Sequence, residues 1–363
     1  MMLKFRYLHS LLFSCIAFTI ITTLICLFGG INISGVTLLN NSFVLYLCLG
    51  VTIVSLLITL ISLKKTLPVT LLKVVFILTF VVAGYLLFDL VILGLVRGFM
   101  VAYSLASKPN STYPLMVRIA YIIKTKYSMI LNGVWTTLWL SLLGTIFGLI
   151  LGLVLVILRT LEIDRRDQEG KAFLKKIGHW FANIYITVFR GTPMLVQAII
   201  IYYFLPGILS GVFGIDRSVF INILTPGVAG LITVSLNTTA YLSEVLRGGI
   251  EAINIGQMEA ARSLGMSRTK AMLHIIFPQA IKNSLPAICN EFIINIKDTS
   301  VLSVISVMDL FFMVNMINGA SGNQDAIFIA AAIYLVLTYG IAFIMKKIEH
   351  KMNLVAKPLP SSN

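Results

Sequence analysis

Polar side chains recur at helical spacing inside two long apolar segments of this sequence. The first set lies in residues 225–246 and comprises Asn237, Tyr241 and Glu244. The second set lies in residues 273–298 and comprises Ser284, Glu291, Asn295 and Asp298. Residues three or four positions apart share one face of a helix. Carboxylate and amide oxygens on such a face have the chemistry to accept hydrogen bonds from the ammonium group of a polar solute.

These stripes permit two interpretations. Inside a bilayer a polar stripe faces protein or water rather than lipid, so it can line a solute pathway. The same side chains can equally form hydrogen bonds between neighbouring helices. We predict pathway contacts from one group of six residues, with interhelical bonding as the alternative: Asn237, Tyr241, Glu244, Glu291, Asn295 and Asp298.

Motifs of catalysis are missing from the sequence. It contains no GxxxxGK[ST] phosphate loop, and no paired carboxylates, nucleophile triad or zinc-binding pattern. The four cysteines and four histidines are scattered without metal-ligand spacing. We therefore expect no enzymatic activity, metal or cofactor on this chain.

Composition identifies the solvent that surrounds these segments. Of the 363 residues, 58% are hydrophobic and only 12% are charged, which is typical of a polytopic membrane protein. The formal net charge is +14, but the basic residues lie in short loops between apolar segments. The positive-inside rule explains this distribution, so we expect a bilayer and no nucleic acid as the surroundings.

About eight transmembrane helices are predicted, because each needs about 20 apolar residues. They cover residues 11–28, 43–63, 74–96, 129–158, 193–213, 225–246, 273–296 and 326–345. The first is expected to be a membrane helix rather than a cleaved signal peptide. Residues 301–318 predict a shorter re-entrant or outer-leaflet helix. Pro278 and Pro286 are expected to kink or break the segment that contains them.

Basic residues orient these helices. They place both termini, the charged loop 159–178 and the stretch 247–286 in the cytoplasm, in the plasma or inner membrane. Residues 97–127 would lie outside, although their five basic residues run against the rule. Within the fourth helix, Gly144, Gly148 and Gly152 recur every four residues and predict a close contact with another helix.

The stretch 247–286 has the pattern of a helical elbow. Asn254 is a suitable cap for a short helix, Gly265 can end that helix in the left-handed conformation, and Ser267 can cap the next one. A capped elbow at a membrane surface is suited to docking into a groove on another protein.

Four motifs carry a resemblance to a known family. Glu259-Ala260-Ala261, followed by Gly265 and by Ile-Ile-Phe-Pro at 275–278, resembles the EAA loop of ABC importer permeases, with Phe277 in place of the usual leucine. Phe-Arg-Gly-Thr-Pro-Met-Leu-Val-Gln at 189–197 is similar to a signature of the polar amino acid subfamily. Residues 132–141 and 241–250 also resemble that subfamily.

The resemblance implies a fold and a division of labour. It implies an all-α permease core of five helices at 128–350, preceded by a three-helix extension at 1–127 and followed by a cytoplasmic tail at 351–363. It also implies an amino acid importer whose EAA loop couples to a separate ATPase through Glu259, Ala260, Ala261 and Gly265. ATP and magnesium would then bind the partner ATPase dimer.

Other partners implied are a second permease subunit, in a homo- or heterodimer, and an extracytoplasmic solute-binding protein.

Two alternative functions remain at this point. A secondary transporter or channel would need no elbow and would use the polar stripes as an ion or proton relay. A non-transporting scaffold or sensor subunit is suggested by the unusual N-terminal helices.

Overall fold

The computed structural model describes residues 88–161 and 168–351, together with single positions at 50, 74, 77, 78, 80–82, 84 and 85. The described residues form helices and no strand. The predicted helix at 11–28, nearly all of the one at 43–63, part of the one at 74–96 and the tail from 352 onward lie outside this range. The all-α prediction is confirmed for the rest of the chain.

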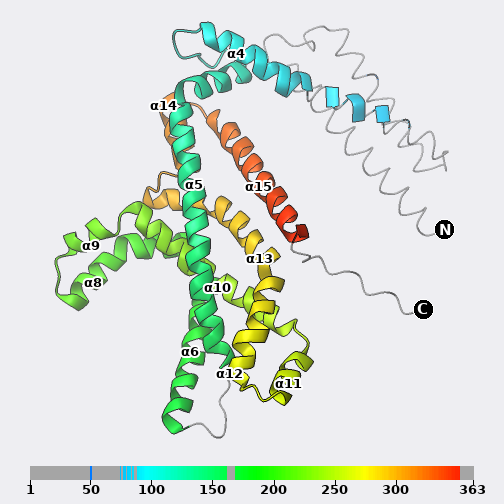
Figure 1. Cartoon of the computed structure of the whole chain (residues 1–363). Coiled ribbons are helices and arrows are strands. Elements are labelled where there is room, and N and C mark those ends of the chain that lie inside the picture. The colour runs from blue at the N-terminus through cyan, green and yellow to red at the C-terminus, as the bar shows by residue number, and fades with distance from the viewer. Residues whose placement is uncertain are drawn as a thin grey trace, which may run out of the picture. The chain divides into compact units, whose positions relative to one another are not determined.

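Figure 1 shows the helices in chain order. They are η2 (Phe88–Leu93), α4 (Gly94–Ser104), α5 (Leu115–Thr160), α6 (Glu169–Gly191), α7 (Met194–Ile199), η3 (Ile200–Phe204), α8 (Leu205–Phe213), α9 (Arg217–Ile223), α10 (Pro226–Glu251), α11 (Ile255–Ser263), α12 (Arg268–Ala271), η4 (Met272–Ile276), α13 (Phe277–Asp298), η5 (Thr299–Ile305), α14 (Leu310–Ser321) and α15 (Ala326–Lys351). The segments η2, η3 and η4 are π-helical, and η5 is a 3₁₀-helix.

Up to five of the described segments are long and apolar enough to cross a membrane. Three are single stretches, at Leu115–Thr160, Met194–Phe213 and Ala326–Glu349. Two are bent pairs: α9 with α10, at 74°, and Arg268–Ile305 with α14, at 52°. This agrees with the predicted five-helix core, whereas the total of eight depends on residues outside the described range.

Two predicted boundaries were wrong. The helix expected at 129 begins at Leu115, because residues 115–132 contain no proline or glycine to stop it. The expected charged loop 159–178 is helical from Glu169, where apolar residues at 173, 174 and 177 give the segment an apolar side at helical spacing. Of the kink or break expected at Pro286, the break does not occur, since α13 continues through this residue.

The chain divides into two compact units, the first of which comprises residues 1–127 with 323–328. Within it, the Lys124 ammonium donates to the carbonyl oxygens of Ala102 and Tyr103 at 3.1 and 3.0 Å, and so caps the end of α4. The Arg118 guanidinium donates to both carboxylate oxygens of Asp325, at 2.7 and 3.0 Å. Two basic residues that run against the positive-inside rule are therefore tied to neighbouring backbone and to a carboxylate.

The second unit comprises residues 128–322 and 329–363, and its centre is the packing of α10 between α5 and α13. A Cβ atom added at Gly148 would lie 2.8 Å from Thr238 Cβ, and one added at Gly144 would lie 2.9 Å from Val234 Cβ. The predicted glycine ridge is thus confirmed as the contact of α5 with α10. The Asn295 amide of α13 donates to Thr145 of α5 at 2.9 Å and to Thr238 of α10 at 3.0 Å.

The segment 299–321 closes the opposite end of this unit from the elbow. Ser306 has a positive φ of 62° and lies between η5 and α14. The fully buried Asp309 caps α14 by accepting from the Phe312 amide at 2.9 Å. The Leu310 amide donates to Thr137 Oγ1 of α5 at 3.1 Å, which fixes the start of the short helix predicted here.

The glycine ridge leads to a first prediction. Gly148→Val should lower the unfolding free energy by about 1–3 kcal/mol, because the added methyl groups overlap Thr238 in a packed contact. The measurement is thermal unfolding of the purified protein in detergent. Gly340→Val on α15, where no atom lies within 4 Å of an added Cβ, is the matched control and should leave the midpoint unchanged. Equal effects of the two substitutions would contradict this packing.

Candidate functional site

The predicted elbow is present, and its turns are closed as the residue types indicated. Asn254 caps α11 by accepting from the Gly256 amide at 2.8 Å, and Ser267 caps α12 by accepting from the Lys270 amide at 3.4 Å. Gly265 has a φ of 84°. The Gly265 and Met266 amides donate to the carbonyl oxygens of Arg262 and Ala261, which completes a glycine-terminated helix end.

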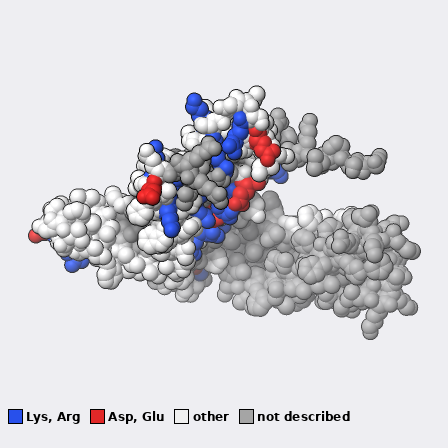
Figure 2. Space-filling view, turned by 90° about the horizontal axis from the view of Figure 1, so that it is seen from below, with Lys and Arg blue, Asp and Glu red and all other residues white. Residues whose placement is uncertain are grey.

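Side chains on the elbow divide into an anchored set and an exposed set. Ala261 is 2% exposed and Ala271 is fully buried, so α11 and α12 are anchored from within. Ile255 and Leu264, by contrast, are 75% and 86% exposed, and Glu259 and Ala260 are also exposed. Lys and Arg side chains gather over this end of the molecule (Figure 2). Exposed apolar residues set among charges are typical of a protein-docking surface.

A cavity of about 480 Å³ lies farther along α10 and α13 from the elbow. Its lining comes from three places in the sequence. The turn between α6 and α7 contributes residues 190–194, α10 contributes Asn237 and Tyr241, and α13 contributes Glu291, Ile294 and Asp298. Four of the six predicted pathway residues are thus brought together around one space.

Charge is distributed unevenly around this cavity. Two carboxylates line it, the buried Glu291 and the half-buried Asp298, two helical turns apart on α13. The Arg190 guanidinium also lines it and lies 5.5 Å from the centroid of the Tyr241 ring. Anionic and cationic groups therefore meet in one cavity, which suits a solute that carries both charges.

Gln197 fixes the turn that forms one wall of the cavity. Pro193 has no backbone N–H to donate, and the break between α6 and α7 leaves backbone carbonyl groups without helical partners. The buried Gln197 amide nitrogen donates to the carbonyl oxygens of Phe189 and Thr192 at 2.9 and 3.1 Å. Its oxygen accepts from the Asn237 amide at 3.1 Å, which joins the turn to α10.

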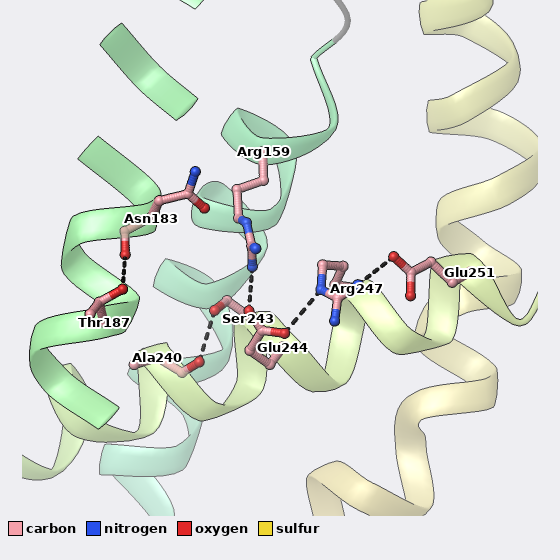
Figure 3. A network of polar contacts seen from close by, with 8 residues as sticks. All are labelled: Arg159, Asn183, Thr187, Ala240, Ser243, Glu244, Arg247 and Glu251. Carbon is pink, nitrogen blue, oxygen red and sulfur yellow. Dashed lines mark hydrogen bonds and ion pairs between the residues drawn. The ribbon is translucent and has the colours of Figure 1, made fainter. Parts of the chain in front are cut away.

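The other two predicted pathway residues do not line the cavity. Asn295 is buried between α5, α10 and α13 and uses its amide for the interhelical bonds described above. Glu244 lies one turn from Tyr241 toward the elbow, and its carboxylate is paired with Arg159 and Arg247 (Figure 3). A pathway role for Asn295 and Glu244 remains a prediction, and their hydrogen bonds and ion pairs in this structure do not favour it.

The comparisons with known proteins identify the family. Residues 170–354 match the model described as binding-protein-dependent transport system inner membrane component. The chain belongs to this family. Membership confirms the resemblance that the elbow and the 189–197 motif indicated, and the components of this family are membrane permease subunits. The matched range begins just after α6 starts and excludes the N-terminal extension.

Relatives within the family include transport proteins of two bacteria. The chain is 39% identical over 174 residues to the arginine transport system permease protein of Bacillus subtilis, covering 48% of this chain and 74% of the relative. It is 34% identical over 190 residues to the glutamine transport system permease protein of Escherichia coli, covering 50% and 81%. A solved amino acid ABC transporter with histidines matches with a TM-score of 0.54 and 33% identity, over 64% of this chain and 98% of that chain.

The sequence did not indicate that Arg190 lines this permease's cavity or that Gln197 holds one of its walls. Arg190 and Gln197 both belong to the 189–197 motif, but the motif alone assigns neither residue a role. The signal for Gln197 was available, since a proline break needs a nearby side chain to satisfy its carbonyl groups. The pairing of Arg190 with Tyr241 joins residues 51 positions apart and has no local signal.

Glu291 provides the test of the cavity. Glu291→Gln should raise the KM for transported solute about tenfold or more, because a charge-assisted hydrogen bond to an ammonium group is worth about 1.5–3 kcal/mol. Initial uptake rates against solute concentration measure this. Asn283→Ala, an exposed polar residue of the same helix outside the cavity lining, is the control. An unchanged KM in Glu291→Gln would place this carboxylate outside the pathway.

Proposed function

We propose that this chain is the permease subunit of an ATP-driven importer of polar amino acids. The observation that carries the proposal is the cavity itself, in which two carboxylates and a guanidinium face a common space. Relatives that are permeases for arginine and glutamine support the substrate class, as does the likeness to a solved amino acid transporter. A zwitterion requires both signs of charge, and this cavity supplies both.

Recognition of the amino acid backbone follows from these charges. Arg190 binds the α-carboxylate, and Glu291 and Asp298 accept hydrogen bonds from the α-ammonium. The two carboxylates outnumber the single guanidinium among the lining side chains. The cavity therefore favours solutes that are neutral or cationic overall above those with an acidic side chain.

Energy enters at the elbow. Its exposed Ile255 and Leu264 form the surface that docks into a cytoplasmic ATPase dimer, which binds ATP and magnesium and performs the hydrolysis. The coupling residues are Glu259, Ala260, Ala261 and Gly265. A second permease subunit completes the pathway, and an extracytoplasmic solute-binding protein delivers the amino acid. The basic face in Figure 2 supports a cytoplasmic position for the elbow.

Orientation and domain organisation follow from the same proposal. With the elbow inside, both chain termini are cytoplasmic. Residues 1–127 are a membrane extension to the permease core at 128–350, and 351–363 are a cytoplasmic tail. The division of the structure after Tyr127 supports the boundary between the extension and the core.

Reconstitution tests this function directly. In proteoliposomes that contain the permease, its ATPase and its binding protein, uptake of labelled glutamine or arginine should require ATP. The ATP must be on the side of the membrane where the ATPase is bound. Glutamate should compete at least about tenfold more weakly, as expected for one unpaired charge near two carboxylates. Uptake by the permease without an ATPase would instead identify a secondary transporter or channel. Equal competition by glutamate would contradict the assigned charges.

Gly265 tests the elbow. Gly265→Val should abolish both ATPase pull-down and uptake while the protein still inserts in the membrane, because a β-branched residue at a φ of 84° is strained by about 1–3 kcal/mol. Gly265→Asn is the matched control, since asparagine tolerates the left-handed conformation. Retained docking and transport in the valine variant would show that this turn is not the coupling surface.

A further inference from the structure

Four alternating charges connect the end of α5 to the end of α10. Arg159, next to the last residue of α5, donates to one carboxylate oxygen of Glu244. The other oxygen of Glu244 accepts from Arg247 Nε at 2.9 Å, and Arg247 donates in turn to Glu251, the last residue of α10. Figure 3 shows this row along α10. Both oxygens of Glu244 are therefore engaged, one by Arg159 of α5 and the other by Arg247 of α10 itself.

The row lies between the cavity and the elbow. Glu244 follows the cavity residue Tyr241 by three positions on α10, and the elbow helix α11 begins at Ile255, four residues after Glu251. Exposure increases along the row in the same direction. The side chains of Glu244 and Arg159 are 20% and 24% exposed, whereas that of Glu251 is 62% exposed. Glu244 is thus the inner, better shielded member.

Backbone contacts hold the neighbouring helices too close for independent movement. A Cβ atom added at Gly249 of α10 would lie 2.8 Å from the carbonyl oxygen of Ala280 on α13. One added at Gly152 of α5 would lie 3.3 Å from the amide nitrogen of Ser243. Leu242 and Leu246 of α10 are buried in one hydrophobic cluster with Val156 of α5 and Phe277 of α13. Translation or rotation of α10 alone would break this packing, so movement at the end of α10 is passed on to the helices beside it.

We infer that Glu244 is a positioning residue for coupled transport: its ion pair with Arg159 holds the last turns of α10 in register with the end of α5, and Arg247, on α10 itself, orients the carboxylate for that pair. Movement of the elbow then reaches Tyr241 and Asn237 in the cavity as a displacement of α10. This inference rests on the proposed function. It assigns Glu244 to the path between ATP hydrolysis and the cavity, and not to contact with the solute.

Purified variants reconstituted with the ATPase and the binding protein test the inference. Glu244→Gln removes the charge and keeps the size of the side chain. We expect the amount of solute transported per ATP hydrolysed to fall at least tenfold, with ATP hydrolysis and KM for the solute each within about twofold of wild type. Partly exposed ion pairs add little to folding stability, so the unfolding midpoint should stay unchanged.

Two further variants sharpen the result. Arg159→Gln should reproduce the loss, and the double variant Arg159→Gln/Glu244→Gln should be no worse than either single one, because both remove the same contact. Glu251→Gln, at the exposed end of the row, is the matched control and should change the transport per ATP by less than twofold.

Three results would overturn the inference. A higher KM with normal transport per ATP would make Glu244 a solute ligand. A proportional loss of transport and ATP hydrolysis with a lower unfolding midpoint would make it a structural residue. Normal behaviour of Glu244→Gln would remove any role. If the wild-type protein shows no ATP-driven uptake in the same vesicles, the proposed function fails and the inference fails with it. If the wild-type protein transports and only the variants disagree with these expectations, the inference alone fails.

Discussion

The close approach of α10 to α5 on one side and to α13 on the other is the constraint on which the permease core depends. Glycines make it possible: Gly148 on α5 and Gly249 on α10 leave no room for a Cβ atom, and Gly152 on α5 leaves very little. Membranes provide no hydrophobic driving force between apolar helices, so such packing and interhelical hydrogen bonds must hold them together. Asn295 supplies those bonds at the centre, from one helix to both of the others.

This packing places chemistry and mechanical input on the same elements. The helices α10 and α13 line the cavity at one level and continue, through Glu251 and η4, into the two sides of the elbow. A signal at the elbow therefore needs no separate route to the solute site. The end of α10 must keep its position relative to α5 for this signal to reach the cavity. The ion pairs of Glu244 lie at that end of α10.

Local features of the sequence predicted local features of the structure. The caps at Asn254 and Ser267, the positive φ of Gly265 and the glycine ridge each depend on residues within a few positions, so they could be identified from spacing alone. The polar stripe on α10 was found for the same reason. The different surroundings of the residues in this stripe could not be predicted. Asn237 and Tyr241 face a cavity, whereas Glu244 pairs with Arg159, a residue 85 positions earlier on another helix. Helical periodicity gives a face but not the neighbour that covers it.

The most direct test of the account is the distance between spin labels at Arg262 on α11 and Val228 at the start of α10, measured in the same permease with and without ATP. Both residues are exposed. The account predicts that this distance stays constant, while the distance between the elbows of the two permease subunits changes on ATP binding. A change between Arg262 and Val228 within one chain would contradict it, because the elbow would then move without carrying α10.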